Sequence, residues 1–80
     1  MSTMVHVHRL PVNATDSELL RLFERVGQVI SCDVVTDGTT RFSKAIGFVQ
    51  MATVQEARKA IDQLNGKELA GRVILVSEGA

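Results

Sequence analysis

Apolar residues recur along this chain at two kinds of spacing, one typical of strands and one typical of helices. Strand-like alternation covers residues 5–10, 29–36, 44–51 and 72–77. Helical spacing follows Thr15 and Thr53, and each threonine has a glutamate three positions later, as in a capping box. Gly27 is expected to end the first helix in a left-handed conformation, and Asn65-Gly66 to end the second. Residues 37–43 carry Asp-Gly and a polar cluster, so we expect a loop between two strands there.

This order predicts an α+β fold of the ferredoxin-like βαββαβ type, with a four-stranded antiparallel sheet and two helices packed on one face. The other face is then open to solvent. Strand alternation directs one set of side chains into the core, namely Ala45, Gly47, Val49 and Met51. It directs the other set to the open face, namely Lys44, Ile46, Phe48 and Gln50. A register slip of one residue would instead bury Phe48.

Length and composition restrict the possible functions. Eighty residues favour a single domain, 1–80, with a core of about residues 4–78. Cys32 has no cysteine partner and is expected to be a small buried residue. His6 and His8 are too few ligands for a zinc site, so we expect no metal and no cofactor. The chain has no apolar run of the roughly 20 residues that span a membrane and no signal-peptide core. We therefore expect an intracellular protein, nuclear or cytoplasmic, that does not bind membranes.

Residues 44–51 resemble the signature octamer of the RNA-recognition-motif family, which has the form K/R-G-F/Y-G/A-F-V-x-F/Y. The matching positions are Lys44, Gly47, Phe48 and Val49, and the departures are Ala45, Ile46 and Met51. Residues 5–10 resemble the family's first-strand hexamer, with His6 in place of an aromatic residue and Arg9 in place of asparagine. The likeness extends over the whole chain.

The resemblance implies that the chain binds short single-stranded RNA on the open face, by stacking and a few phosphate contacts, with modest affinity. It implies stacking on Phe48 and His6, packing against Ile46, and base-edge contacts from Gln50 and the last strand. The full set of implied RNA-binding residues is His6, His8, Arg9, Arg41, Lys44, Ile46, Phe48, Gln50, Leu75 and Ser77. Nine basic and nine acidic residues cancel, so stacking has to contribute more than phosphate attraction. Asp33 is expected to share the open face.

A protein-interaction module of the same fold is the alternative. It would use an apolar area on the open face, with Val35, Ile46, Val73 and Leu75 as candidates, or the first helix at Leu20. One subtype of the family binds peptides through an Arg-x-Phe sequence after the second helix, and residues 66–69 lack that sequence. No residues combine a nucleophile, a base and an oxyanion site, so we do not expect an enzyme. The start and end of the chain indicate the N-terminal piece of a larger protein, and we expect the domain itself to be monomeric.

Overall fold

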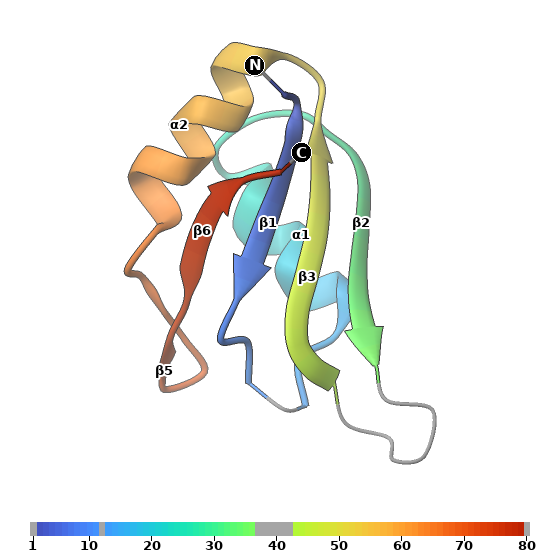
Figure 1. Ribbon diagram of the computed structural model, residues 1–80, viewed down its shortest axis with the longest axis vertical. Coiled ribbons are helices and arrows are strands. Elements are labelled where there is room, and N and C mark those ends of the chain that lie inside the picture. The colour runs from blue at the N-terminus through green and yellow to red at the C-terminus, as the bar shows by residue number, and fades with distance from the viewer. Residues whose placement is uncertain (1, 12, 37–42, 80) are drawn as a thin grey trace.

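The computed structural model describes residues 2–11, 13–36 and 43–79, and it has the predicted two layers (Figure 1). One four-stranded antiparallel sheet has the order β2-β3-β1-β6. Its strands are β1 (Met4–His8), β2 (Val29–Thr36), β3 (Ser43–Met51) and β6 (Leu75–Glu78). The helices α1 (Asp16–Glu24) and α2 (Val54–Leu64) contribute their buried residues to one core cluster with the inward residues of the sheet, so both pack on the same face and the other face stays open. In Figure 1, α1 passes behind β1 and β3, and α2 lies beside β6. The predicted α+β ferredoxin-like fold is therefore confirmed.

The predicted capping box at the start of α1 is present. Thr15 Oγ1 accepts a hydrogen bond from the Glu18 backbone N–H at 3.2 Å, and the Glu18 carboxylate accepts from the Thr15 N–H at 3.1 Å. These two bonds satisfy backbone donors that have no partner within the helix. The helix then turns Leu19 and Phe23 toward the sheet, where both are completely buried.

The capping box at the start of α2 is formed in one direction only. Thr53 Oγ1 accepts from the Glu56 N–H at 3.1 Å, as in α1. The Glu56 carboxylate instead accepts from the Thr53 hydroxyl at 3.0 Å and from the Gln28 N–H at 2.5 Å. Glu56 thereby links α2 to the segment that enters β2. A bond between residues so distant in sequence leaves no local pattern, so the sequence did not indicate it.

Gly27 does not adopt the left-handed conformation that we expected. Positive φ angles among the described glycines occur at Gly66 (86°) and Gly71 (84°), so the prediction for Gly66 is confirmed and the one for Gly27 is wrong. Glycine is required at position 27 for another reason, because a Cβ atom there would overlap the Glu56 carboxylate. The glycine therefore leaves room for the carboxylate that binds the neighbouring backbone.

The predicted last strand, residues 72–77, is divided in two. Its first part is β5 (Arg72–Val73), which pairs with β4 (Glu68–Leu69) in a separate hairpin. The turn between them has positive φ at Ala70 (51°) and Gly71 (84°), as in the two-residue turns that suit hairpins. Only β6 joins the main sheet, so the placement of Val73 on the open face of that sheet is wrong.

The first strand is shorter than predicted, because β1 ends at His8 and not at residue 10. Arg9 has a φ of 63°, a conformation that costs a residue with a side chain about 1–2 kcal/mol. Arg72 stabilises this turn by donating from Nε to the Arg9 carbonyl at 3.0 Å. The turn allows Leu10 to be completely buried.

The core lies between the helices and the sheet, and it contains the predicted inward-facing residues of β3. Val49 and Met51 are at most 1% exposed. Gly47 is also buried, and a Cβ atom there would lie 2.6 Å from Leu19 Cδ2. Glycine at this position therefore permits α1 to pack closely on β3. The side chain of Ala45 lies outside the described part of the chain, as do residues 37–42 of the predicted loop.

On each outermost strand of the sheet, a backbone N–H donates to a side chain. The Asp16 carboxylate accepts from the Val34 N–H on β2 at 2.8 Å. Asn65 Oδ1 accepts from the Val76 N–H on β6 at 2.9 Å. Occupied donors make a strand edge less able to pair with another chain.

Candidate nucleic-acid interface

The pairing register arranges the open face in cross-strand rows. The central row contains Asp33, Phe48, His6 and Ser77. The row next to it contains Val35, Ile46, His8 and Leu75. A third row contains Ser31, Gln50 and Met4. Phe48 is partly exposed while Val49 is completely buried, so the predicted face of β3 is confirmed and the slipped register is wrong.

Phe48 and His6 form an edge-to-face pair at the centre of this surface. Their ring centroids lie 4.9 Å apart and their planes are inclined by 89°. Aromatic pairs favour this arrangement over a face-to-face one. A base that stacks on one ring therefore meets the edge of the other ring. Two parallel bases cannot stack on both rings at once, so the pair provides one stacking plane.

Gly79 lies against the opposite side of His6. The chain after β6 bends toward β1 (Figure 1), where the Gly79 N–H donates to the Met4 carbonyl at 2.7 Å. A Cβ atom on Gly79 would lie 2.9 Å from His6 Nε2, so a larger residue would displace the imidazole. His6 is thus held between Phe48 and Gly79. Phe48 is consequently the better candidate for the stacking ring.

The cationic residues of the predicted site are only partly placed by the structure. Arg9 is exposed directly after β1, and the Arg72 guanidinium lies beside its backbone. Arg41 and the side chain of Lys44 lie outside the described residues. Sequence reasoning did not select Arg72 as a site residue, since the bond that brings it to Arg9 spans 63 positions.

Asp33 introduces a negative charge beside Phe48. It is exposed and pairs directly with Phe48 across the strands, so its predicted place on the open face is confirmed. An ionised carboxylate accepts hydrogen bonds and donates none. Asp33 can therefore accept from the amino group of a base, and it repels phosphates.

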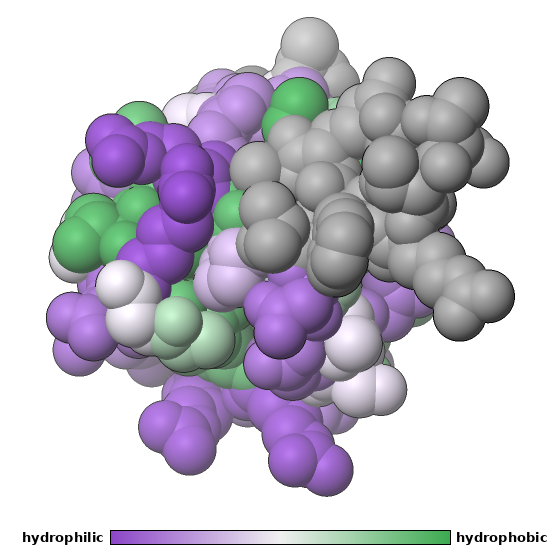
Figure 2. Space-filling view, turned by 90° about the horizontal axis from the view of Figure 1, so that it is seen from below, coloured by the Kyte–Doolittle hydropathy of each residue, from purple (hydrophilic) through white to green (hydrophobic). Residues whose placement is uncertain are grey.

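The predicted apolar area on the open face is not continuous. Val35 and Ile46 are direct neighbours, but His8 separates them from Leu75, which is 44% exposed. Leu20 is half-buried, so it is not the exposed contact point that we considered. Ile30, at a break in the β2–β3 register, is 57% exposed, which the sequence did not indicate. From the end that carries the β4–β5 hairpin, the coloured surface also shows hydrophobic residues separated by hydrophilic ones (Figure 2).

The described residues contain neither a metal-binding cluster nor a membrane-spanning helix. No three His, Cys, Asp or Glu residues of this part of the chain gather as a metal site. Neither of its helices has the length and apolar character needed to cross a membrane.

Cys32 is only partly buried, contrary to our expectation, although it packs against the core. Its Sγ lies 3.7 Å from the Asp16 carbonyl oxygen. Burial raises the pKa of the Cys32 thiol to about 11, and the negative charges of Asp16 and Asp33 contribute to the rise. Only the thiolate is a good nucleophile, so Cys32 is a poor one at neutral pH.

We expect Cys32 to react with iodoacetamide at pH 8 about 100-fold more slowly in the folded chain than in the urea-unfolded chain. The raised pKa lowers the thiolate fraction by about that factor relative to the ordinary value of 9.0. A thiol with a pKa of about 11 is mostly protonated below that pH. The rate at which folded Cys32 reacts should therefore keep rising up to about pH 11. Mass spectrometry of timed samples measures both rates. Equal rates in the two states would contradict the prediction.

Comparison with known proteins relates this chain to a family. A family model described as the RNA recognition motif matches residues 5–75. The chloroplastic 29 kDa ribonucleoprotein A of Nicotiana sylvestris is 40% identical over 75 residues, which cover 94% of this chain and 28% of that protein. Glycine-rich RNA-binding protein 10 of Brassica napus is 43% identical over 63 residues, covering 79% of this chain and 37% of that protein. The chain thus spans well under half the length of these relatives.

Solved structures agree with the sequence comparison. The structure of the Rna15 RRM with bound RNA (GU) is similar with a TM-score of 0.91 and 26% identity, over 100% of this chain and 85% of that one. The family model covers most of the chain, and most of the signature residues named above lie on the two central strands of the open sheet, β1 and β3. The resemblance noted at residues 44–51 is therefore confirmed, and the chain belongs to the RNA recognition motif family.

Proposed function

We propose that this chain binds short single-stranded RNA on the open face of its sheet, with modest affinity. The observation that carries the proposal is the half-buried Phe48 ring at the centre of that face, between Asp33 and His6. Membership of the family supports it, as does the bound RNA in the similar Rna15 structure. Relatives named as ribonucleoproteins support a role in post-transcriptional RNA processing inside the cell.

One base stacks on Phe48, which is worth about 1–3 kcal/mol. His6 supports the ring edge-on, and its imidazole offers a hydrogen bond to the nucleotide. Ile46 and His8 in the adjoining row contact the neighbouring sugar or base. The perpendicular rings limit strong stacking to one base at a time, which is the physical reason for modest affinity.

Base edges are read by the polar side chains around Phe48. Ser77 and Gln50 supply both donors and acceptors, and Asp33 supplies acceptors alone. Leu75 supplies an exposed apolar contact at the end of the second row. Arg9, Arg41 and Lys44 contact phosphates, with Arg72 beside Arg9 as an additional cation.

An NMR titration tests this proposal directly. Amide resonances of the uniformly ¹⁵N-labelled chain are followed while an RNA of about eight nucleotides and mixed sequence is added. We expect shifts at Phe48, His6 and Ser77, and none at Gln55 or Asp62 on the exposed side of α2. Absence of shifts at millimolar RNA would contradict RNA binding.

The salt dependence of the affinity tests the balance between stacking and charge. Three or four phosphate contacts predict that log K falls with log[salt] with a slope of about −2 to −3, because each contact on a single strand contributes roughly −0.7. Fluorescence anisotropy with labelled RNA at several KCl concentrations measures the slope. A slope of about −4 or steeper would show that at least six phosphates are neutralised and that stacking is not the main source of affinity.

A further inference from the structure

The Phe48 ring has different neighbours on its two sides in the central row of the open face. Because β3 lies between β1 and β2, His6 flanks the ring on one side and Asp33 flanks it on the other. His6 is paired with the ring and is only partly exposed, since Gly79 covers its far side. Asp33 is exposed. A base stacked on Phe48 therefore meets an accessible charged group on the β2 side.

The Asp33 carboxylate is available to a ligand. In the part of the chain that the structure describes, no residue donates a hydrogen bond to it or forms an ion pair with it. The carboxylate of Asp16, by contrast, already accepts from the Val34 N–H at 2.8 Å. An ionised carboxylate has two acceptor oxygens and no donor. Asp33 thus offers a stacked base a pair of adjacent acceptors.

The spacing of the strands brings Asp33 within reach of such a base. Neighbouring strands lie about 4.8 Å apart, and directly opposed residues project their side chains on the same face. A purine stacked over Phe48 is wide enough for one of its edges to meet the carboxylate of the opposed Asp33. Because the carboxylate repels phosphates, the nucleotide presents its base edge to β2 and keeps its sugar-phosphate side away.

We propose that Asp33 makes the Phe48 position selective for guanine, a preference that rests on the proposed RNA binding. The Watson–Crick edge of guanine carries two adjacent donors, N1–H and N2–H, and these match the two carboxylate oxygens. Adenine and cytosine carry an amino donor beside a ring nitrogen that accepts. Uracil carries an N–H between two carbonyl oxygens. In these three bases an acceptor faces the carboxylate and repels it, so guanine alone forms a bond with each oxygen.

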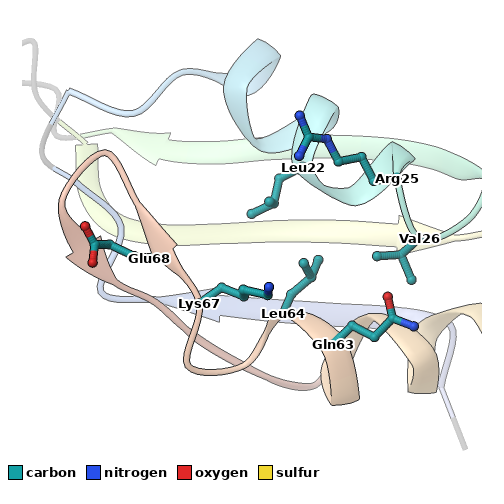
Figure 3. Close-up of a pocket in the computed structure, with 7 residues that line it drawn as sticks. All are labelled: Leu22, Arg25, Val26, Gln63, Leu64, Lys67 and Glu68. Atoms are coloured by element: carbon teal, nitrogen blue, oxygen red, sulfur yellow. The ribbon is translucent and has the colours of Figure 1, made fainter.

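A hollow on the helical side of the sheet also contains a carboxylate, that of Glu68 (Figure 3). It lies between α1 and the segment that leaves α2, and its described lining contains no aromatic ring on which a base can stack. Stacking and paired acceptors occur together at Phe48 and Asp33. The amides of Leu22 and Lys67, which line the hollow, therefore serve as a reference that guanine should not shift.

Fluorescence anisotropy with labelled RNAs that differ at one base tests the proposal on the 80-residue chain. The probes are UUUGUUUU, UUUAUUUU, UUUUUUUU and UUUIUUUU, in which I is inosine. Adenine controls for the larger stacking surface of a purine, and inosine keeps the rings and N1–H of guanine but lacks its amino group. We expect the guanine RNA to bind roughly fivefold more tightly than the adenine RNA and about threefold more tightly than the inosine RNA.

Asp33→Asn identifies the residue that reads the base. Asparagine offers one acceptor and one donor, a pattern that matches the Watson–Crick edge of adenine, so the preference for guanine over adenine should disappear or reverse. The matched control Asp62→Asn makes the same chemical change at an exposed position of α2 and should keep the preference. If Asp33→Asn strengthened the binding of all four RNAs equally, Asp33 would act only by repelling phosphates, and the proposal would be wrong.

The guanine preference and RNA binding itself can fail separately. If all four RNAs bound equally and shifted the amide of Phe48 in the ¹⁵N-labelled chain, RNA binding would stand and the guanine assignment would be overturned. If none bound at millimolar concentration, both proposals would be overturned. The inosine comparison requires no substitution in the chain, so it decides the question even if Asp33→Asn does not fold.

Discussion

Replacing Phe48 with alanine is expected to weaken RNA binding roughly 5- to 150-fold, because about 1–3 kcal/mol of stacking is lost. The effect should be large because the perpendicular His6 ring cannot offer a second stacking plane parallel to that of Phe48. Fluorescence anisotropy with a labelled RNA of mixed sequence measures the change. Phe48→Trp, which keeps a stacking surface, should retain most of the affinity.

Val73→Ala is the matched control for this measurement. Val73 is an exposed apolar residue (46%) like those of the open face, but it lies on the β4–β5 hairpin. Its removal should change the affinity less than about twofold, because it adds no stacking ring to the RNA surface. If Phe48→Ala bound RNA as tightly as Val73→Ala, the stacking role of Phe48 would be wrong.

Replacing Phe23 with alanine is expected to lower the free energy of unfolding by about 3–5 kcal/mol. Phe23 is completely buried between α1 and the sheet, so its removal leaves a cavity in the core. A domain of this length has a total stability of roughly 4–12 kcal/mol, so the variant should be close to unfolding. Urea denaturation followed by circular dichroism measures the loss.

Two further variants separate stability from binding. Phe23→Leu keeps most of the buried volume and should cost less than Phe23→Ala, which keeps the experiment informative if the alanine variant does not fold. Phe48→Ala should cost only about 1 kcal/mol of stability, since its ring is partly exposed. A loss of stability at Phe48 equal to that at Phe23 would show that Phe48 is a core residue and not a binding residue.

The two phenylalanines show what alternation and family resemblance can establish. Phe23 lies on the apolar stripe of a helix, and Phe48 lies at an outward position of a strand whose inward neighbours are Gly47 and Val49. Both patterns depend on side chains that are near in sequence, so the chain alone indicates them. The capping box of Thr15 and Glu18 was predictable for the same reason, since its partners are three positions apart.

Contacts between distant segments were not predictable in this way. Glu56 binds the backbone of Gln28, Arg72 binds that of Arg9, and Gly79 covers His6. Each contact joins residues on different elements, and no periodic pattern records such a pair. These contacts explain why position 27 needs glycine, why β1 ends at His8, and why His6 is only partly exposed.

The sequence by itself therefore determined the order of the elements, the inward and outward faces of β3, and the family. These depend on periodicity and on short motifs, which are local properties of a chain. Only the tertiary structure decided that Phe48 and His6 are perpendicular, that the last strand divides, and that Leu22 remains only partly buried. Those features depend on how separate elements pack together, and packing is specified by the whole chain at once.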